Sequence, residues 1–275
     1  ANTIAGYLAE HLPAKNTRTP TLIAGDVEID IQEWQAPTLG QRSRDPVEAP
    51  DGSIWWTGMW ASLVGRLDPK TGAMEEYKLP VTARPHSIVP AADGSIWYTG
   101  NSNGTIGKLD PATGLITQYT TTASDPHSAA FHPNGKLYFT AQNSNMLGVL
   151  DPATGEVKEV QTEPRPYGIK VAKSGTLFVA YNGTNKIGAV DPETLAVRYY
   201  EIPNTASRIR RLDIASDGIV WYVNSTQGKV GRLNPATGEI KEWDSPSGPQ
   251  SSPYALAVID DKVWYNESGV RPDTL

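Results

Sequence analysis

The chain has 275 residues, 39% hydrophobic and 20% charged, which is enough to bury the core of one large domain. Acidic residues outnumber basic ones by 30 to 24, and the net charge of −6 disfavours a nucleic-acid partner. The absence of cysteine excludes disulfides, thiolate metal sites and a thiol nucleophile. Since no apolar run approaches the roughly 18 residues of a membrane span, we also expect no such span.

Residues 1–24 differ from the rest of the chain. Ile4, Leu8 and Leu12 are spaced as on one face of a helix, and Pro13 ends the pattern. We therefore predict a helical extension over residues 1–24, followed by a second region over residues 25–275. The helix is either a short surface element or the last helix of an upstream domain removed from this chain.

A five-residue phrase recurs every 40 to 43 residues. Its first residue is Asp or Asn, followed by Pro and, two residues later, Thr; it begins at Asp68, Asp110, Asp151, Asp191 and Asn234. Such a phrase is a turn, because the first side chain caps it, Pro sets φ and the closing Gly accepts a left-handed conformation. Each phrase thus separates two strands.

The rest of each repeat predicts two further strands. An Asp-Gly or Asn-Gly turn precedes an aromatic strand in most repeats, as in Ile96-Trp-Tyr98 and Leu137-Tyr-Phe139. Four short strands in about 40 residues are typical of one β-propeller blade. The predicted fold class is therefore all-β, a β-propeller of four-stranded antiparallel blades.

The ends of the repeat region bear on how the ring closes. Ile29–Trp34 resembles the outermost strand of a blade, and the last repeat stops after its aromatic strand. The chain therefore contains five full repeats, an incomplete C-terminal blade and a lone outer strand. Either six blades close with a defective one, or seven blades are present in the intact protein; we favour seven.

The innermost strands of a propeller line a central channel, and function usually lies at its mouth. Alignment on the residue after the proline that precedes each inner strand places six residues in one register: Val47, His86, His127, Tyr167, Arg210 and Tyr254. Two of the four histidines fall here, and imidazole is a suitable general base near neutral pH. The alternative is that both histidines are structural ends of inner strands, bonded to neighbouring carbonyl groups.

Several phrases resemble those of the virginiamycin B lyase (streptogramin lyase) family. They are Arg84-Pro-His-Ser-Ile88, Ile96-Trp-Tyr-Thr99, Asn103-Gly-Thr-Ile-Gly-Lys-Leu109 and the Asp/Asn-Pro-Ala-Thr-Gly turn. The resemblance implies a seven-bladed propeller that opens a cyclic depsipeptide by Mg²⁺-assisted elimination at its ester.

Carried over by motif, the resemblance implies that His86 and His127 are catalytic and that Asp125 and Gln142 stand at the metal positions. It also implies a binding role for Tyr167, and we add Arg210 and Tyr254 from the same register as substrate-binding residues. Two departures are present, because the family has Glu where Asp125 and Gln142 stand. The family also places this site across the ring closure, whereas here it falls in central blades.

Two functions remain open at this point. The first is a Mg²⁺-dependent carbon–oxygen lyase acting on a cyclic ester. The second is a non-catalytic propeller that binds a small-molecule or cyclic peptide ligand, or a protein partner, as one domain of a larger exported protein. Gln142 favours the second, and the arc of His86, His127 and Tyr167 favours the first. We expect a periplasmic or secreted protein.

Overall fold

The computed structural model describes residues 31–271 and 273–275. The chain divides into two units, Ala1–Trp34 and Gln35–Leu275, of which the second contains every strand described below. The helix predicted over residues 1–24 lies outside the described residues. Among the described residues, no helix is long and apolar enough to cross a membrane.

The second unit is built from antiparallel sheets, each formed by strands that follow one another in the chain. The first sheet contains β1 (Ser43–Glu48), β2 (Ile54–Gly58), β3 (Leu63–Leu67) and β4 (Met74–Lys78). The second contains β5 (Pro85–Pro90), β6 (Ile96–Gly100), β7 (Thr105–Leu109) and β8 (Ile116–Thr120). The third contains β9 (Pro126–Phe131), β10 (Leu137–Ala141), β11 (Met146–Leu150) and β12 (Val157–Gln161).

Two further sheets have four strands and one has two. The fourth contains β13 (Pro166–Val171), β14 (Leu177–Tyr181), β15 (Lys186–Val190) and β16 (Val197–Glu201). The fifth contains β17 (Ile209–Ile214), β18 (Val220–Asn224), β19 (Lys229–Leu233) and β20 (Ile240–Asp244). A short 3₁₀ helix, η1 (Pro249–Ser251), leads into the sixth sheet, which contains β21 (Pro253–Ile259) and β22 (Lys262–Glu267).

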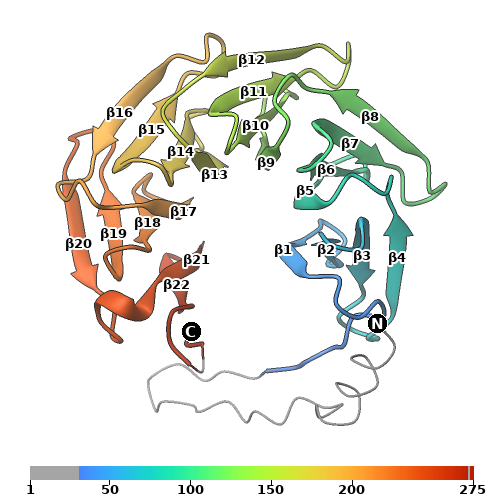
Figure 1. Ribbon diagram of the computed structural model, residues 1–275, viewed down its shortest axis with the longest axis horizontal. Helices are drawn as coiled ribbons and strands as arrows, with labels where there is room; N and C mark the ends of the chain where they lie inside the picture. Colours follow the sequence, from blue (N-terminus) through green and yellow to red (C-terminus); the bar gives the residue numbers. More distant parts are fainter. Residues whose placement is uncertain (1–30, 272) are drawn as a thin grey trace, which may run out of the picture. The chain divides into compact units, whose positions relative to one another are not determined.

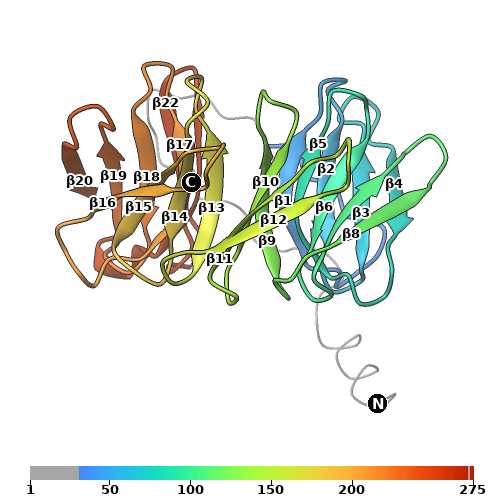
Figure 2. The same cartoon turned by 90° about the horizontal axis from the view of Figure 1, so that it is seen from above.

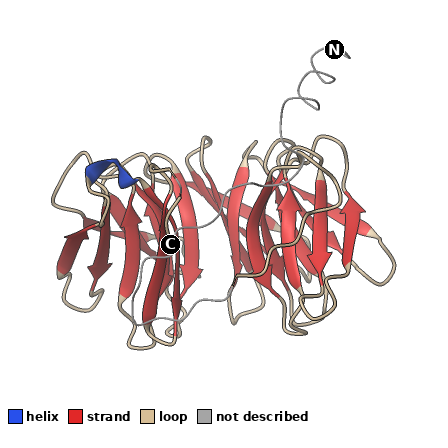
Figure 3. Ribbon diagram, turned by 90° about the horizontal axis from the view of Figure 1, so that it is seen from below, coloured by secondary structure: helices blue, strands red, loops and turns tan. Residues whose placement is uncertain are grey.

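The sheets of this unit follow one another around a common centre, which the first strand of each sheet faces (Figure 1). Consecutive inner strands are neighbours, in the order β1, β5, β9, β13, β17, β21. Figures 2 and 3 show the same sheets from the side. Five four-stranded sheets and a partial sixth are the arrangement expected for propeller blades.

The recurring phrase forms the predicted turn between the third and fourth strands. The backbone N–H of Gly114 donates to the carbonyl of Asp110 (2.8 Å), and the Asp110 carboxylate accepts from the Ala112 N–H (2.9 Å). Leu195 occupies the position that glycine holds in the other four phrases, and it adopts a φ of +59°. The turn prediction from the sequence is therefore confirmed.

The outer strand predicted at Ile29–Trp34 is not found where it can be checked, because residues 31–34 carry no strand. Residues 29 and 30 lie outside the described residues. The physical reason lies in the last sheet, in which β22 pairs with β21 and, among the described residues, otherwise makes only an isolated bridge from Glu267 to Thr274. An outer strand pairs only with a third strand, and the described residues of this sheet provide none.

Aromatic rings from the second strands fill the core between blades. Tyr98, Tyr138, Phe139, Tyr181 and Tyr222 are each less than 2% exposed. A glycine on the third strand faces several of these rings, as Gly107 faces Tyr98 and Gly148 faces Phe139. The ring occupies the space that a Cβ would need, which explains why the third strand repeats a glycine at this register.

Candidate functional site

Each inner strand carries a β-bulge close to its first residue. The pairing register of the inner strand with its neighbour breaks there in all six sheets. A bulge leaves two residues out of the regular ladder and redirects their side chains. The residues left out of the ladder are His86-Ser87, His127-Ser128, Tyr167-Gly168, Arg210-Arg211 and Tyr254-Ala255 in five sheets, and Asp45-Pro46 in the first sheet, where Arg44 still pairs with Thr57.

This register corrects one member of the predicted ring. Val47 pairs with Trp55, as Val89 pairs with Trp97 in the next sheet, so Val47 corresponds to Val89. Arg44 is the residue that corresponds to His86. Pro46 misled the alignment, because it lies inside the bulge rather than before it.

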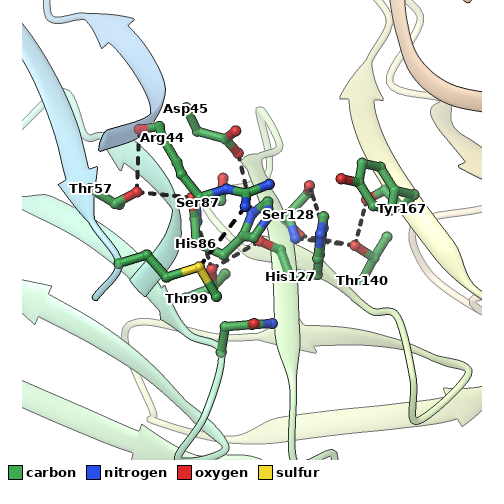
Figure 4. Close-up of polar contacts among 12 residues, drawn as sticks. Arg44, Asp45, Thr57, His86, Ser87, Thr99, His127, Ser128, Thr140 and Tyr167 are labelled. Carbon is green, nitrogen blue, oxygen red and sulfur yellow. Dashed lines mark hydrogen bonds and ion pairs between the residues drawn. The ribbon is translucent and has the colours of Figure 1, made fainter. Parts of the chain in front are cut away.

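Three predicted residues, His86, His127 and Tyr167, lie against one another. The ring centres of His86 and His127 are 3.6 Å apart, and those of His127 and Tyr167 are 4.1 Å apart (Figure 4). Each of the three side chains is only 3% exposed. They converge as predicted, but they form a buried layer and not the walls of an open cavity. Two cavities of about 470 and 800 Å³ lie between blades, and none of the three residues lines either.

Arg44, Arg210 and Tyr254 are partly exposed, and Tyr254 links the other two to Tyr167. The Tyr254 hydroxyl lies 2.7 Å from the Tyr167 hydroxyl, and Nη2 of Arg44 donates to Tyr254 (2.8 Å). The Arg210 guanidinium lies 5.1 Å from the centre of the Tyr254 ring and 5.8 Å from that of Tyr167. These distances are typical of cation–π contacts.

An ion pair joins the first and fifth sheets across this end of the inner strands. Nη2 of Arg211 lies 2.7 Å from Oδ1 of Asp45, and Nη1 donates to the Ser128 hydroxyl (3.1 Å). That hydroxyl is also 3.1 Å from Nδ1 of His127, and Oδ2 of Asp45 lies 3.5 Å from Nδ1 of His86. The mouth cluster, as we define it, comprises Arg44, Asp45, His86, His127, Ser128, Tyr167, Arg210, Arg211 and Tyr254.

Four members of the cluster were missed from the sequence, namely Arg44, Asp45, Ser128 and Arg211. Ser128 and Arg211 directly follow His127 and Arg210, which are in the predicted register. Arg44 is the first blade's true counterpart of His86, and Asp45 directly follows it. An alignment anchored on the aromatic strands, with the following residue included, would have found all four.

Buried threonines hold the cluster's backbone in place. Oγ1 of Thr57 donates to the carbonyl of His86 (3.0 Å), that of Thr99 to His127 (2.9 Å) and that of Thr140 to Tyr167 (2.7 Å). The three threonines share one register of β2, β6 and β10 and are 0% exposed. The first three blades thus each position the mouth residue of the next blade through a buried hydrogen bond.

The chain is similar in sequence and in fold to known proteins. The sequence model of the virginiamycin B lyase family matches residues 29–271. The chain belongs to this family. A Staphylococcus aureus virginiamycin B lyase structure is 26% identical, with 82% of this chain and 78% of that chain covered and a TM-score of 0.75. A streptogramin B lyase structure is 27% identical, with 86% and 80% covered and a TM-score of 0.79.

More distant likenesses concern the fold alone. Hydrazine synthase from Kuenenia stuttgartiensis is 16% identical, with 87% of this chain and 78% of that chain covered and a TM-score of 0.73. A search of curated protein sequences found no match. The family is therefore established by its own sequence model and by the two lyase structures.

The residues at the family's metal positions do not fit a magnesium ion. The Asp125 carboxylate accepts hydrogen bonds from the backbone N–H groups of Asn143 (2.5 Å) and Ser144 (3.0 Å) and from the Ser144 hydroxyl (2.5 Å). The Gln142 amide is neutral and, with its oxygen turned toward Arg165, accepts from that guanidinium. No group of three or more His, Asp or Glu residues in the described part of the chain is placed to hold a metal. Asp125 thus holds the turn at residues 143–144 of its own blade, and Gln142 contacts Arg165, which leads into the next blade.

Both histidines of the cluster are held in the neutral form. Burial lowers the pKa of His127 well below its usual value, and the neighbouring His86 and Arg211 lower it further. Burial also lowers the pKa of His86, although Asp45 acts in the opposite direction. Both side chains are therefore uncharged imidazoles at neutral pH.

We expect acid to destabilise the protein through these histidines. The unfolded chain binds protons at His127 below about pH 6.5 while the folded chain does not, so stability is lost as the pH falls through that value. Between about pH 7 and about pH 5 the loss is up to about 2 kcal/mol for His127. Urea denaturation at each pH measures it. The variant His127→Gln should flatten this pH dependence, whereas His132→Gln, distant from the cluster, should leave it unchanged; the reverse result would contradict the assignment.

Proposed function

We propose that this propeller binds a small organic ligand or a cyclic peptide at the mouth cluster, without the magnesium-dependent elimination that the family resemblance implies. One observation carries the proposal. The two side chains at the family's metal positions are engaged by protein partners, Asp125 by three donors and Gln142 by Arg165. Magnesium could bind only if these hydrogen bonds were broken, whereas a ligand at the mouth cluster leaves them intact.

The cluster supplies what a binding site needs. Arg44, Arg210 and Tyr254 are partly exposed, so they are the side chains that a ligand would contact first. The rings of Tyr167 and His127 form a rigid buried base beneath them. Rigid aromatic surfaces and fixed donors reduce the entropy lost on binding.

A second candidate, elimination at an ester, is favoured by the neutral state of His127. An unprotonated imidazole can take the proton α to a carbonyl, after which the Cα–Cβ double bond forms and the bond from Cβ to the ester oxygen breaks. Against this role, Nδ1 of His127 is engaged by Ser128 at 3.1 Å and the side chain is 3% exposed. A substrate would reach it only after Tyr167 or its neighbours moved.

Quinupristin is a suitable test compound, since a catalytically inactive variant of the S. aureus lyase was solved with it (23% identity, 87% of this chain and 82% of that chain covered, TM-score 0.80). We expect the protein, with Mg²⁺ present, to leave quinupristin intact, because Asp125 is the one carboxylate at the family's two metal positions and three protein donors engage it. Elimination adds no water, so chromatography with ultraviolet detection of a new double bond is the measurement. The variant Gln142→Glu should also be inactive, because the new carboxylate would pair with Arg165. Ring opening by the wild type that is lost in His127→Gln would overturn the proposal in favour of the lyase.

A further inference from the structure

Two guanidinium groups of the mouth cluster have no acidic partner in the described part of the chain. Arg44 and Arg210 come from the first and fifth sheets and meet at Tyr254, one at its hydroxyl (2.8 Å) and the other over its ring (5.1 Å). Neither forms an ion pair with any residue that the structure describes. Nε of Arg210 is buried and has no hydrogen-bond partner there. A buried donor without a partner is costly, and native sites with one are usually completed by a ligand or water.

The charge of the cluster is strongly positive in a chain that is negative overall. Arg211 is neutralised by Asp45 at 2.7 Å, and Asp45 is the one carboxylate of the cluster. Arg44 and Arg210 therefore remain as excess positive charge, whereas the whole chain carries −6. Such a local reversal of sign attracts anions and repels divalent cations.

The hydroxyl groups add a donor to the two guanidinium groups. The Tyr167 and Tyr254 hydroxyls share one hydrogen bond of 2.7 Å, and the oxygen of Tyr254 accepts from Arg44. The two hydroxyls have two protons, so one proton is left without an acceptor among the described residues. Burial keeps Tyr167 protonated by raising its pKa to about 12. The groups that the two arginines and the tyrosine pair leave free are thus donors.

We propose that the mouth cluster binds the carboxylate of a small organic acid, held by Arg210 and Arg44 and by the free phenol proton of the Tyr167–Tyr254 pair. The inference rests on the proposed binding function and specifies its ligand class. A guanidinium presents a planar fork that matches a carboxylate. The rings of Tyr254 and Tyr167 would pack against the organic part of the ligand, which favours an organic acid over an inorganic anion.

The experiment compares four probes at low salt: benzoate, its neutral isostere benzamide, inorganic phosphate and Mg²⁺. Binding is measured by calorimetry and by NMR of the histidine side chains. We expect benzoate to bind roughly tenfold or more tightly than benzamide and phosphate, with an affinity that weakens as salt is added. Mg²⁺ should not displace it.

Two arginine variants give a matched control. Arg210→Met keeps an unbranched apolar side chain in place of the arginine stem and removes the guanidinium with its charge, and it should weaken benzoate binding roughly tenfold or more. Arg208→Met should leave the affinity unchanged, because that guanidinium bonds the carbonyls of Thr205 (3.1 Å) and Ser207 (2.6 Å) instead of facing the cluster. Equal effects of the two variants would overturn the inference.

The outcomes separate this inference from the proposed function. If benzamide binds as tightly as benzoate and both shift the His127 signal, the preference for an anion is wrong while binding at the cluster stands. If phosphate binds and benzoate does not, the organic-acid assignment is wrong. If neither quinupristin nor any of the four probes shifts the His127 signal, the inference and the proposed binding function both fail.

Discussion

Asp45→Asn is expected to lower the free energy of unfolding by about 3 kcal/mol, because it leaves the Arg211 guanidinium without its partner. Breaking a buried ion pair from one side costs roughly 3–5 kcal/mol. The Asp45 and Arg211 side chains are 20% and 18% exposed, so water recovers part of the loss and the lower end applies. Asparagine suits the test, since Asp45 has a φ of +43° and Asn tolerates that left-handed region better than most residues.

The pair can be isolated by a double-mutant cycle in urea denaturation. Arg211→Met alone should also destabilise, and the double variant should lose clearly less than the sum of the two single losses. Glu239→Gln is the matched control, because Glu239 pairs with Lys241 at 2.9 Å with both side chains about half exposed, and we expect it to change stability little. Additive losses at Asp45 and Arg211 would show that the two sheets are not coupled through this pair.

Gly148→Ala is expected to destabilise the third blade by about 3 kcal/mol, at the upper end of the cost of overpacking. A Cβ at Gly148 would lie 2.1 Å from Cζ of Phe139, whose side chain is 0% exposed and cannot move aside. Unfolding by urea measures the loss. The change should be smaller in a Phe139→Leu background, where the ring has been removed.

A second glycine separates this steric cost from conformational strain. Gly114 has a φ of +72° and no atom within 4 Å of the position of a Cβ, so Gly114→Ala should cost only about 1 kcal/mol. Similar losses at Gly148 and Gly114 would contradict the packing explanation for the glycine of the third strand.

Local chemistry explains why much of the fold could be predicted. The turn that starts at Asp110 needs only an Asx side chain, a proline and a residue that accepts positive φ, and all of these are visible in the sequence. The convergence of His86, His127 and Tyr167 followed from the same repeat, because equivalent positions of neighbouring inner strands lie side by side.

What could not be predicted depends on contacts between blades and on local alternatives. The repeat aligns residues within blades, so it does not indicate that Arg211 of the fifth blade meets Asp45 of the first. Pro46 shifted the first blade's alignment from Arg44 to Val47. The motif around Asp125 likewise carried no information about the donors of residues 143–144, which take up its carboxylate.

The central claim is that ligands bind at the mouth cluster, and histidine NMR tests it most directly. The chain has four histidines, and the signals of His86, His127 and His132 can be assigned with single His→Gln variants. When benzoate or quinupristin is added, the account predicts that the signals of His86 and His127 shift together while that of His132 does not move. A shift confined to His132, or no shift at His86 and His127 with either probe at saturating concentration, would contradict it.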